Sequence, residues 1–195
     1  MQKLIFLLLF LPLSADAQEL NLLKYNQDRL KVDKTLMLTL SSWSAANIGV
    51  SAYGWATAEN EAKYFHQMNT IWAGINLALA LPGYIKALRT DPNEYNFAKT
   101  VREQHKTEKI FTFNTALDVG YVATGLLMRG LANPEKESYH QLKGFGSGII
   151  LQGGFLLLLD ATAIIIHSRH NKKQLNPFFD KIELSDNGIG LKLRL

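Results

Sequence analysis

One stretch of the chain, from Gly144 to His167, is almost wholly apolar and carries a single formal charge, at Asp160. About 20 predominantly apolar residues cross a bilayer as a helix, because an α-helix rises about 1.5 Å per residue and the hydrocarbon core is about 30 Å thick. The stretch therefore predicts a membrane span, around which the rest of the chain has to fold.

Three weaker apolar stretches precede it, at residues 35–56, 67–88 and 110–131. Polar connections separate the four stretches and are short enough to place neighbouring helices antiparallel. Pro82 and Gly83 predict a kink or an early end of the second helix, since proline removes one backbone donor. Together the stretches predict an all-α fold, a membrane four-helix bundle over residues 35–167 with its fourth helix at 144–167.

The segments outside these stretches differ in composition. Residues 1–17 have the three parts of a secretory signal: Lys3, an apolar run and a cleavage site of small residues before Gln18. Residues 18–34 carry leucines at helical spacing among polar residues, which predicts an amphipathic helix on the membrane surface. Residues 168–195 form a basic tail whose apolar residues alternate around an Asn-Gly pair, and this pattern predicts a short β-hairpin or extended tail.

Two short motifs occur twice. Residues 44–49 (Ser-Ala-Ala-Asn-Ile-Gly) match residues 115–120 (Thr-Ala-Leu-Asp-Val-Gly), and residues 65–68 match residues 139–142, where both copies contain His-Gln. The two offsets differ only by an insertion in the connection, where insertions are tolerated. The pattern predicts an internal repeat, with the first helix pair duplicated in the same orientation as the second. Chance similarity between apolar helices is the alternative.

Two signals for membrane orientation disagree. Most of the 21 Lys and Arg residues lie in segments that a four-span topology places on one side, and the positive-inside rule assigns that side to the cytoplasm. A cleaved signal would instead export the same side. We favour the signal because it acts first, and we expect an integral, multi-pass protein of the bacterial inner membrane.

The chain contains no cysteine and no motif typical of a phosphate-binding loop, a dinucleotide fold, a nucleophile elbow or a zinc protease. We therefore expect no enzyme activity, no cofactor and no metal. The net charge of +4 is expected to face anionic lipid headgroups rather than nucleic acid.

Polar residues inside the predicted spans are the candidate functional positions. Asp118 and Asp160 are predicted at similar depth, roughly 12 and 10 Å below the same membrane surface. An isolated acidic side chain in a span costs on the order of 2.5 to 3.5 kcal/mol, so the pair is expected to share a proton or to hold a cation. Asn47 and Asn114 are predicted in the same polar layer. The alternative is a neutral, hydrogen-bonded pair that only fixes helix packing.

Two histidines provide another candidate site. His66 and His140 occupy equivalent positions of the predicted repeat, at the same membrane surface. Histidines from facing helices can hold haem iron, so a haem-binding electron-transfer bundle is one alternative. Interfacial histidines that hydrogen-bond headgroups or backbone carbonyls are the other.

The layout of a signal segment, four spans and a short basic tail resembles the small envelope membrane proteins of Gram-negative bacteria that have no assigned function. The resemblance implies no activity and no site residue. We predict a non-enzymatic scaffold or assembly factor of the bacterial envelope, whose partners are the lipid bilayer and membrane proteins or a second copy of the chain. A proton or cation transporter, or a channel subunit, using Asp118 and Asp160 is the alternative.

Overall fold

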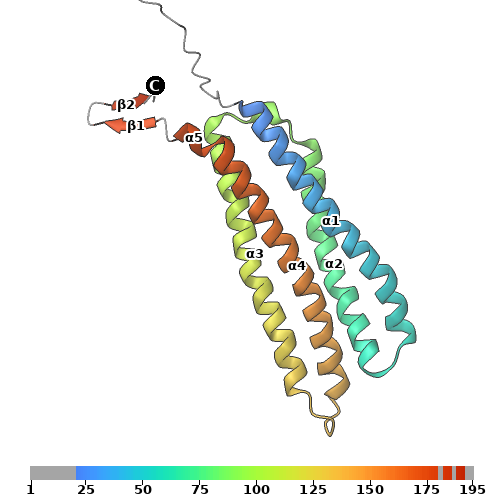
Figure 1. Ribbon diagram of the computed structural model, residues 1–195. Coiled ribbons are helices and arrows are strands. Elements are labelled where there is room, and N and C mark those ends of the chain that lie inside the picture. Colours follow the sequence, from blue (N-terminus) through green and yellow to red (C-terminus); the bar gives the residue numbers. More distant parts are fainter. Residues whose placement is uncertain (1–20, 180–181, 186–187, 192–195) are drawn as a thin grey trace, which may run out of the picture.

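The structure is a computed structural model that describes residues 21–179, 182–185 and 188–191. Four long helices run alternately up and down beside one another (Figure 1): α1 (Leu22–Thr57), α2 (Asn60–Arg89), α3 (Phe97–Leu131) and α4 (Tyr139–Gln174). The shorter elements are η1 (Pro92–Glu94), α5 (Asn176–Phe179), β1 (Ile182–Ser185) and β2 (Gly188–Leu191), and the two strands pair antiparallel. The predicted all-α four-helix fold is confirmed. The predicted signal, residues 1–17, lies outside the described residues.

The two ends of the bundle are built differently (Figure 1). At one end α1 begins, η1 connects α2 to α3 and α4 ends; we call this the η1 end. At the opposite end, residues 58–59 connect α1 to α2 and residues 132–138 connect α3 to α4. Asn21 and Asn96 cap α1 and α3 at the η1 end, where each side chain accepts a hydrogen bond of 2.9 Å from a backbone N–H in the first turn.

The helices are longer than the spans predicted inside them. They contain 30 to 36 residues, or about 45 to 54 Å at the usual rise, and therefore extend beyond a hydrocarbon core of about 30 Å. Residues 22–34 differ from the prediction of a separate surface helix, because no Gly or Pro interrupts them and they continue directly into 35–56. Residues 97–109 continue into 110–131 in the same way.

Helix α2 also runs past the position where an early end was predicted. It contains Pro82 and continues to Arg89. Proline removes one hydrogen bond, but an unwound backbone in a bilayer would leave several polar groups unsatisfied, each at a cost of several kcal/mol. Continuing the helix is the less costly solution.

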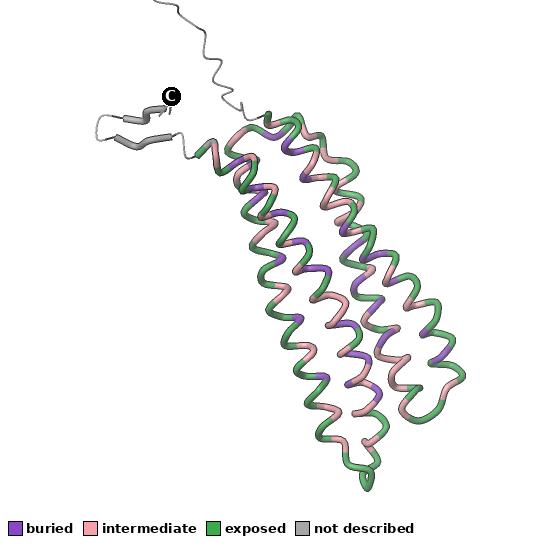
Figure 2. The backbone as a smooth tube through the Cα atoms, viewed as in Figure 1, coloured by how far each residue is buried: buried purple, intermediate pink, exposed green. Residues whose placement is uncertain are grey.

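Three helices, α2, α3 and α4, are long and apolar enough to cross a membrane, whereas α1 does not reach the same hydropathy within the described residues. Large apolar side chains are nevertheless exposed on all four helices, among them Val50, Leu79, Phe113 and Leu158, which are 64 to 72% exposed. Buried residues lie on the inward sides of the helices (Figure 2), and among those other than glycine the polar residues outnumber the apolar ones. Polar residues inside and apolar residues outside are the arrangement that a lipid environment favours.

The bundle consists of two helix pairs joined through α4. Helix α1 packs along α2, α3 packs along α4, and the contact of α2 with α4 connects the pairs. Nearer the η1 end, an apolar cluster fills the space between them, formed by Leu36, Leu40, Ala80, Phe111, Leu159 and Ala163.

Glycines bring the backbones of α4 and its two neighbours together at the opposite end. A Cβ atom on Gly146 would lie 2.7 Å from the carbonyl oxygen of Gly125 in α3. A Cβ atom on Gly144 would meet the backbone of α2 at Glu61 and Phe65. Small residues permit such close approach of membrane helices, so the glycines of 144–148 serve helix packing.

We expect Gly146→Ala to destabilise the bundle by about 1 to 3 kcal/mol, because the added methyl group overpacks a contact made by backbone atoms. The measurement is the thermal unfolding midpoint of the protein in detergent. Gly154→Ala is the matched control on the same helix, because nothing lies within 4 Å of its Cβ position. Equal midpoints for the two variants would contradict the packing account.

Candidate functional site

A pair of carboxyl groups occupies the interior of the bundle between α3 and α4. Asp118 and Asp160 hydrogen-bond to each other, and Asn114 hydrogen-bonds to Asp160. Asp118 is 2% exposed and Asp160 is 6% exposed. An ionised carboxylate only accepts hydrogen bonds, so a bond between two carboxyl groups requires a proton on one of them. A proton shared between the two carboxyl groups would satisfy this contact inside the apolar part of the bundle.

A cavity of about 460 Å³ lies beside this pair. Its polar wall contains Asn76, Asn114, Asp118 and Asp160, and the remaining lining is apolar or aromatic and comes from α1, α2, α3 and α4. Asn76 Nδ2 and Asp118 Oδ2 are buried and have no hydrogen-bond partner within the described part of the chain. Buried polar atoms are usually hydrogen-bonded, so these two atoms are available to water, an ion or a small polar group in the cavity.

The structure places Asn47 in a different layer. Gln152 of α4 donates from Nε2 to Asn47 Oδ1 at 3.1 Å and to Asn69 Oδ1 at 2.6 Å, and its Oε1 accepts from Trp43 Nε1 at 3.0 Å. Gln152 precedes Asp160 by eight residues, or about 12 Å along the helix. The carboxyl pair therefore has Asn114 as its neighbour and Asn76 in the wall of the same cavity, while Asn47 belongs to an amide cluster nearer the opposite end.

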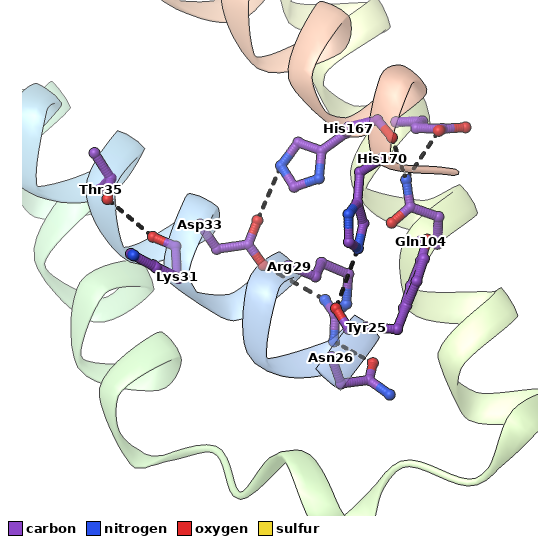
Figure 3. Close-up of polar contacts among 10 residues, drawn as sticks. Tyr25, Asn26, Arg29, Lys31, Asp33, Thr35, Gln104, His167 and His170 are labelled. Atoms are coloured by element: carbon purple, nitrogen blue, oxygen red, sulfur yellow. Dashed lines mark hydrogen bonds and ion pairs between the residues drawn. The ribbon is translucent and has the colours of Figure 1, made fainter. Parts of the chain in front are cut away.

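A second polar cluster, at the η1 end, was not predicted from the sequence (Figure 3). His167 of α4 faces Asp33 of α1, with 3.2 Å between His167 Nε2 and Asp33 Oδ1. Arg29 donates to the other oxygen of Asp33 at 3.4 Å and lies over the ring of Tyr95, 4.9 Å from its centroid. Arg29 and His167 are 2% and 1% exposed. The cluster therefore brings a buried cation and a buried imidazole together on one half-buried carboxylate.

Helix α3 closes this cluster. Gln104 donates to the backbone oxygen of His167 at 3.1 Å and to Glu108 at 2.9 Å. The ring of Phe111 stacks on His167, with 5.7 Å between centroids, and Phe111 also lines the cavity beside the carboxyl pair. A single aromatic ring thus separates the η1-end cluster from the cavity.

His170 lies in the same cluster, beyond the apolar stretch of α4. Its Nε2 is 3.1 Å from the backbone oxygen of Tyr25, and its Nδ1 is 3.5 Å from Gln174 Nε2. A carbonyl only accepts and an amide nitrogen only donates, so these partners fit the neutral ring with its proton on Nε2. Burial lowers the pKa of His170 below its ordinary value; the Tyr25 carbonyl and Asp28 oppose this shift, and His167 and Arg29 add to it. Burial also disfavours the charged form of the Tyr25 phenol and therefore raises its pKa.

The two histidines considered as haem ligands contact different neighbours. The ring of His66 packs against Gly54 of α1. His140 is exposed at the start of α4 and lies beside Tyr139, with 5.2 Å between the ring centroids. Within the described residues, no group of three or more His, Asp and Glu side chains is arranged to hold a metal ion.

A family model described as a family of unknown function, DUF6992, matches residues 39–161, well over half of the chain. The chain belongs to this DUF6992 family. The match includes both carboxyl groups of the pair and ends before His167, and it begins after Arg29 and Asp33. Neither a curated protein nor a solved structure matches the chain. The family therefore identifies the bundle without assigning an activity to it.

We expect the contribution of His170 to the stability of the protein to fall as the pH drops below about 6.5, because the unfolded chain then binds a proton that buried His170 resists. The sign follows from the lowered pKa of His170. The stability that the neutral ring gives the folded protein is fully present above the pKa of this histidine in the unfolded chain, and it is lost at lower pH. The measurement is the unfolding midpoint between pH 7.5 and 5.5. His170→Gln keeps a donor for the Tyr25 carbonyl and should reduce the slope of the unfolding midpoint against pH. The exposed control His140→Gln should not, and equal slopes for the two variants would refute this role of His170.

Proposed function

We propose that this integral membrane protein carries protons, or a monovalent cation in exchange for a proton, through the Asp118–Asp160 pair. The observation that supports the proposal is the hydrogen bond between two carboxyl groups that are more than nine-tenths buried and line a cavity. Ionisable groups inside membrane spans are costly and usually belong to ion or proton pathways. A pair that shares a proton can release it and take it back without breaking a covalent bond.

Polar groups on both sides of the pair support a proton pathway. Toward the η1 end, the cavity meets Phe111, behind which lie His167 and Asp33. Toward the opposite end, Gln152 and its amide partners come first. Ser147 follows and hydrogen-bonds to Arg129, which forms an ion pair of 3.5 Å with Glu61. The remaining gaps along α4 are about 10 to 12 Å, a distance that water molecules in the cavity would have to bridge.

Asp118→Asn and Asp160→Asn test the proposal, because asparagine keeps the size of the side chain and can hydrogen-bond to the remaining carboxyl group but carries no exchangeable acidic proton. We expect both variants to fold normally. Their proton flux, measured with a pH-sensitive dye in reconstituted vesicles, should be at least tenfold lower than that of the wild type. Asp91→Asn, an exposed position in the η1 connection, is the matched control and should keep the wild-type flux.

Two results would overturn this function. One is a wild-type flux no higher than that of empty vesicles under a pH gradient or with an alkali cation on one side. The other is an unchanged flux in both folded Asn variants, which would leave the pair with a packing role only.

A scaffold or assembly factor is the second candidate, supported by the outward face of α1. This face carries small, exposed residues at the depth of the bilayer: Ser42, Ala45, Ala46, Gly49 and Ala52. Nothing lies within 4 Å of the Cβ position of Gly49, and α1 is less apolar than the other three long helices. Small residues and low hydropathy are typical of a helix that packs against another helix rather than against lipid.

Cysteine cross-linking tests this second candidate, since the chain has no native cysteine. We expect Ala46→Cys to form a disulfide-linked dimer in membranes under mild oxidation, and Gly49→Leu in the same chain to reduce the dimer fraction severalfold. Ala78→Cys on the exposed side of α2 is the control and should stay monomeric. A monomeric Ala46→Cys protein that is purified alone in mild detergent would count against the scaffold.

We further propose that the protein lies in the bacterial inner membrane and arose by duplication of a helix pair. The location is supported by the signal-like segment 1–17 and by the apolar helices. The duplication is supported by the like packing of α1 on α2 and of α3 on α4. In the proposed repeat, Asn47 corresponds to Asp118. This correspondence is one of sequence, because the structure places Asn47 beside Gln152 and Asp118 beside Asp160.

A further inference from the structure

A second, smaller cavity of about 180 Å³ opens at the η1 end between α1, α2 and α3. Three basic residues from three different helices line it: Arg29, Lys86 and Lys106. Its inner end is apolar and includes Met37, Ile110 and Phe111, which also line the large cavity beside the carboxyl pair. The pocket is thus basic at its mouth and apolar at its inner end.

The cations of this pocket are not matched by carboxylates. Asp33 lies in the pocket lining, but its two oxygens already contact Arg29 at 3.4 Å and His167 at 3.2 Å. Lys86 and Lys106 are exposed and form no ion pair with any residue that the structure describes. Glu103 is the remaining acidic residue of the lining, so the pocket keeps a net positive charge.

Arg29, which lines the pocket, has one hydrogen-bond donor without a partner. Its Nη atoms bind Asp33 and Asn26, whereas its Nε is buried and makes no hydrogen bond within the described residues. A buried guanidinium N–H without an acceptor is costly, and phosphate oxygens are among its best acceptors. The orphan donor and the two unpaired lysines therefore point to an anionic oxygen ligand.

The position of the pocket fits the headgroup layer of a bilayer. Lys86 lies in the last turn of α2, and Lys106 precedes Ile110, where the apolar stretch of α3 begins. Lys106 lies about 18 Å along α3 from Asp118. On the membrane side, the exposed side chains of Ile85 and Ile110 lie next to the pocket residues and offer an apolar surface to an acyl chain.

We propose that this pocket binds the headgroup of an anionic phospholipid. The phosphate would lie between Lys86 and Lys106 and accept from Arg29, and an acyl chain would lie against Ile110 between α2 and α3. Free inorganic phosphate has the same oxygen chemistry as the lipid headgroup but carries no acyl chain. This difference distinguishes the two ligands. The proposal does not depend on proton transfer at the carboxyl pair.

Native mass spectrometry of the full chain in a non-ionic detergent tests the site, with phosphatidylglycerol as the probe and phosphatidylcholine as the zwitterionic reference. Each basic residue near a membrane surface contributes about 1 kcal/mol, or about a fivefold change in affinity. We therefore expect Lys86→Gln and Lys106→Gln each to weaken phosphatidylglycerol binding about fivefold. Glu103→Gln should strengthen it, because the variant removes the opposing carboxylate.

Lys136→Gln, an exposed lysine in the loop at the opposite end, removes the same charge and should leave binding unchanged. Circular dichroism of each variant verifies the fold, and the lysines are exposed enough to be replaced without disturbing it. Equal affinities for the two lipids, or equal losses in Lys86→Gln and Lys136→Gln, would overturn the proposal. Displacement of bound phosphatidylglycerol by an equimolar amount of inorganic phosphate would assign the pocket to soluble phosphate and overturn the lipid assignment.

Discussion

The close approach of α4 to both α2 and α3 is the contact on which the architecture depends. Gly144 and Gly146 face different neighbours, so one short segment of α4 brings three backbones together. In a bilayer, apolar side chains gain nothing by leaving lipid for one another, and van der Waals contact at short range takes over as the source of stability. These glycines hold the two helix pairs together at the opposite end, and the apolar cluster around Phe111 joins them nearer the η1 end.

Between these two contact regions the interior is polar. The amide cluster at Gln152, the carboxyl pair and the η1-end cluster follow one another along α4. Hydrogen bonds between membrane helices contribute only about 0.6 kcal/mol each on average, so stability alone gives little reason to place carboxyl groups there. Asn or Gln would provide comparable hydrogen bonds without an ionisable proton. The contact of two acids is therefore the observation on which the proposed function rests.

Much of the bundle could be predicted from the sequence, because membrane spans depend mainly on length and hydropathy. The same rise per residue placed Asp118 and Asp160 at one depth, and the structure brings them into contact. Depth alone does not determine which side of a helix a residue faces, and Asn47 accordingly pairs with Gln152 instead.

The η1-end cluster could not be predicted from the leucines of residues 18–34, which indicate a helix on the membrane surface. The side that packs in the bundle is polar: buried Tyr25, Asn26 and Arg29 and half-buried Asp33 recur at helical spacing and face α3 and α4. This spacing was visible in the sequence. Its partners, Gln104 and His167, lie far away along the chain, and only the tertiary structure identifies them.

The glycine contact at the opposite end also limits how the bundle can move. The backbones of α3 and α4 touch at Gly125 and Gly146, which fixes their spacing at that level. If both carboxyl groups of the pair became charged, their repulsion would push α3 and α4 apart. The helices could then separate only toward the η1 end, with the glycine contact as the hinge. The ring of Phe111 would move away from His167, and water would gain access to the pair from that side alone.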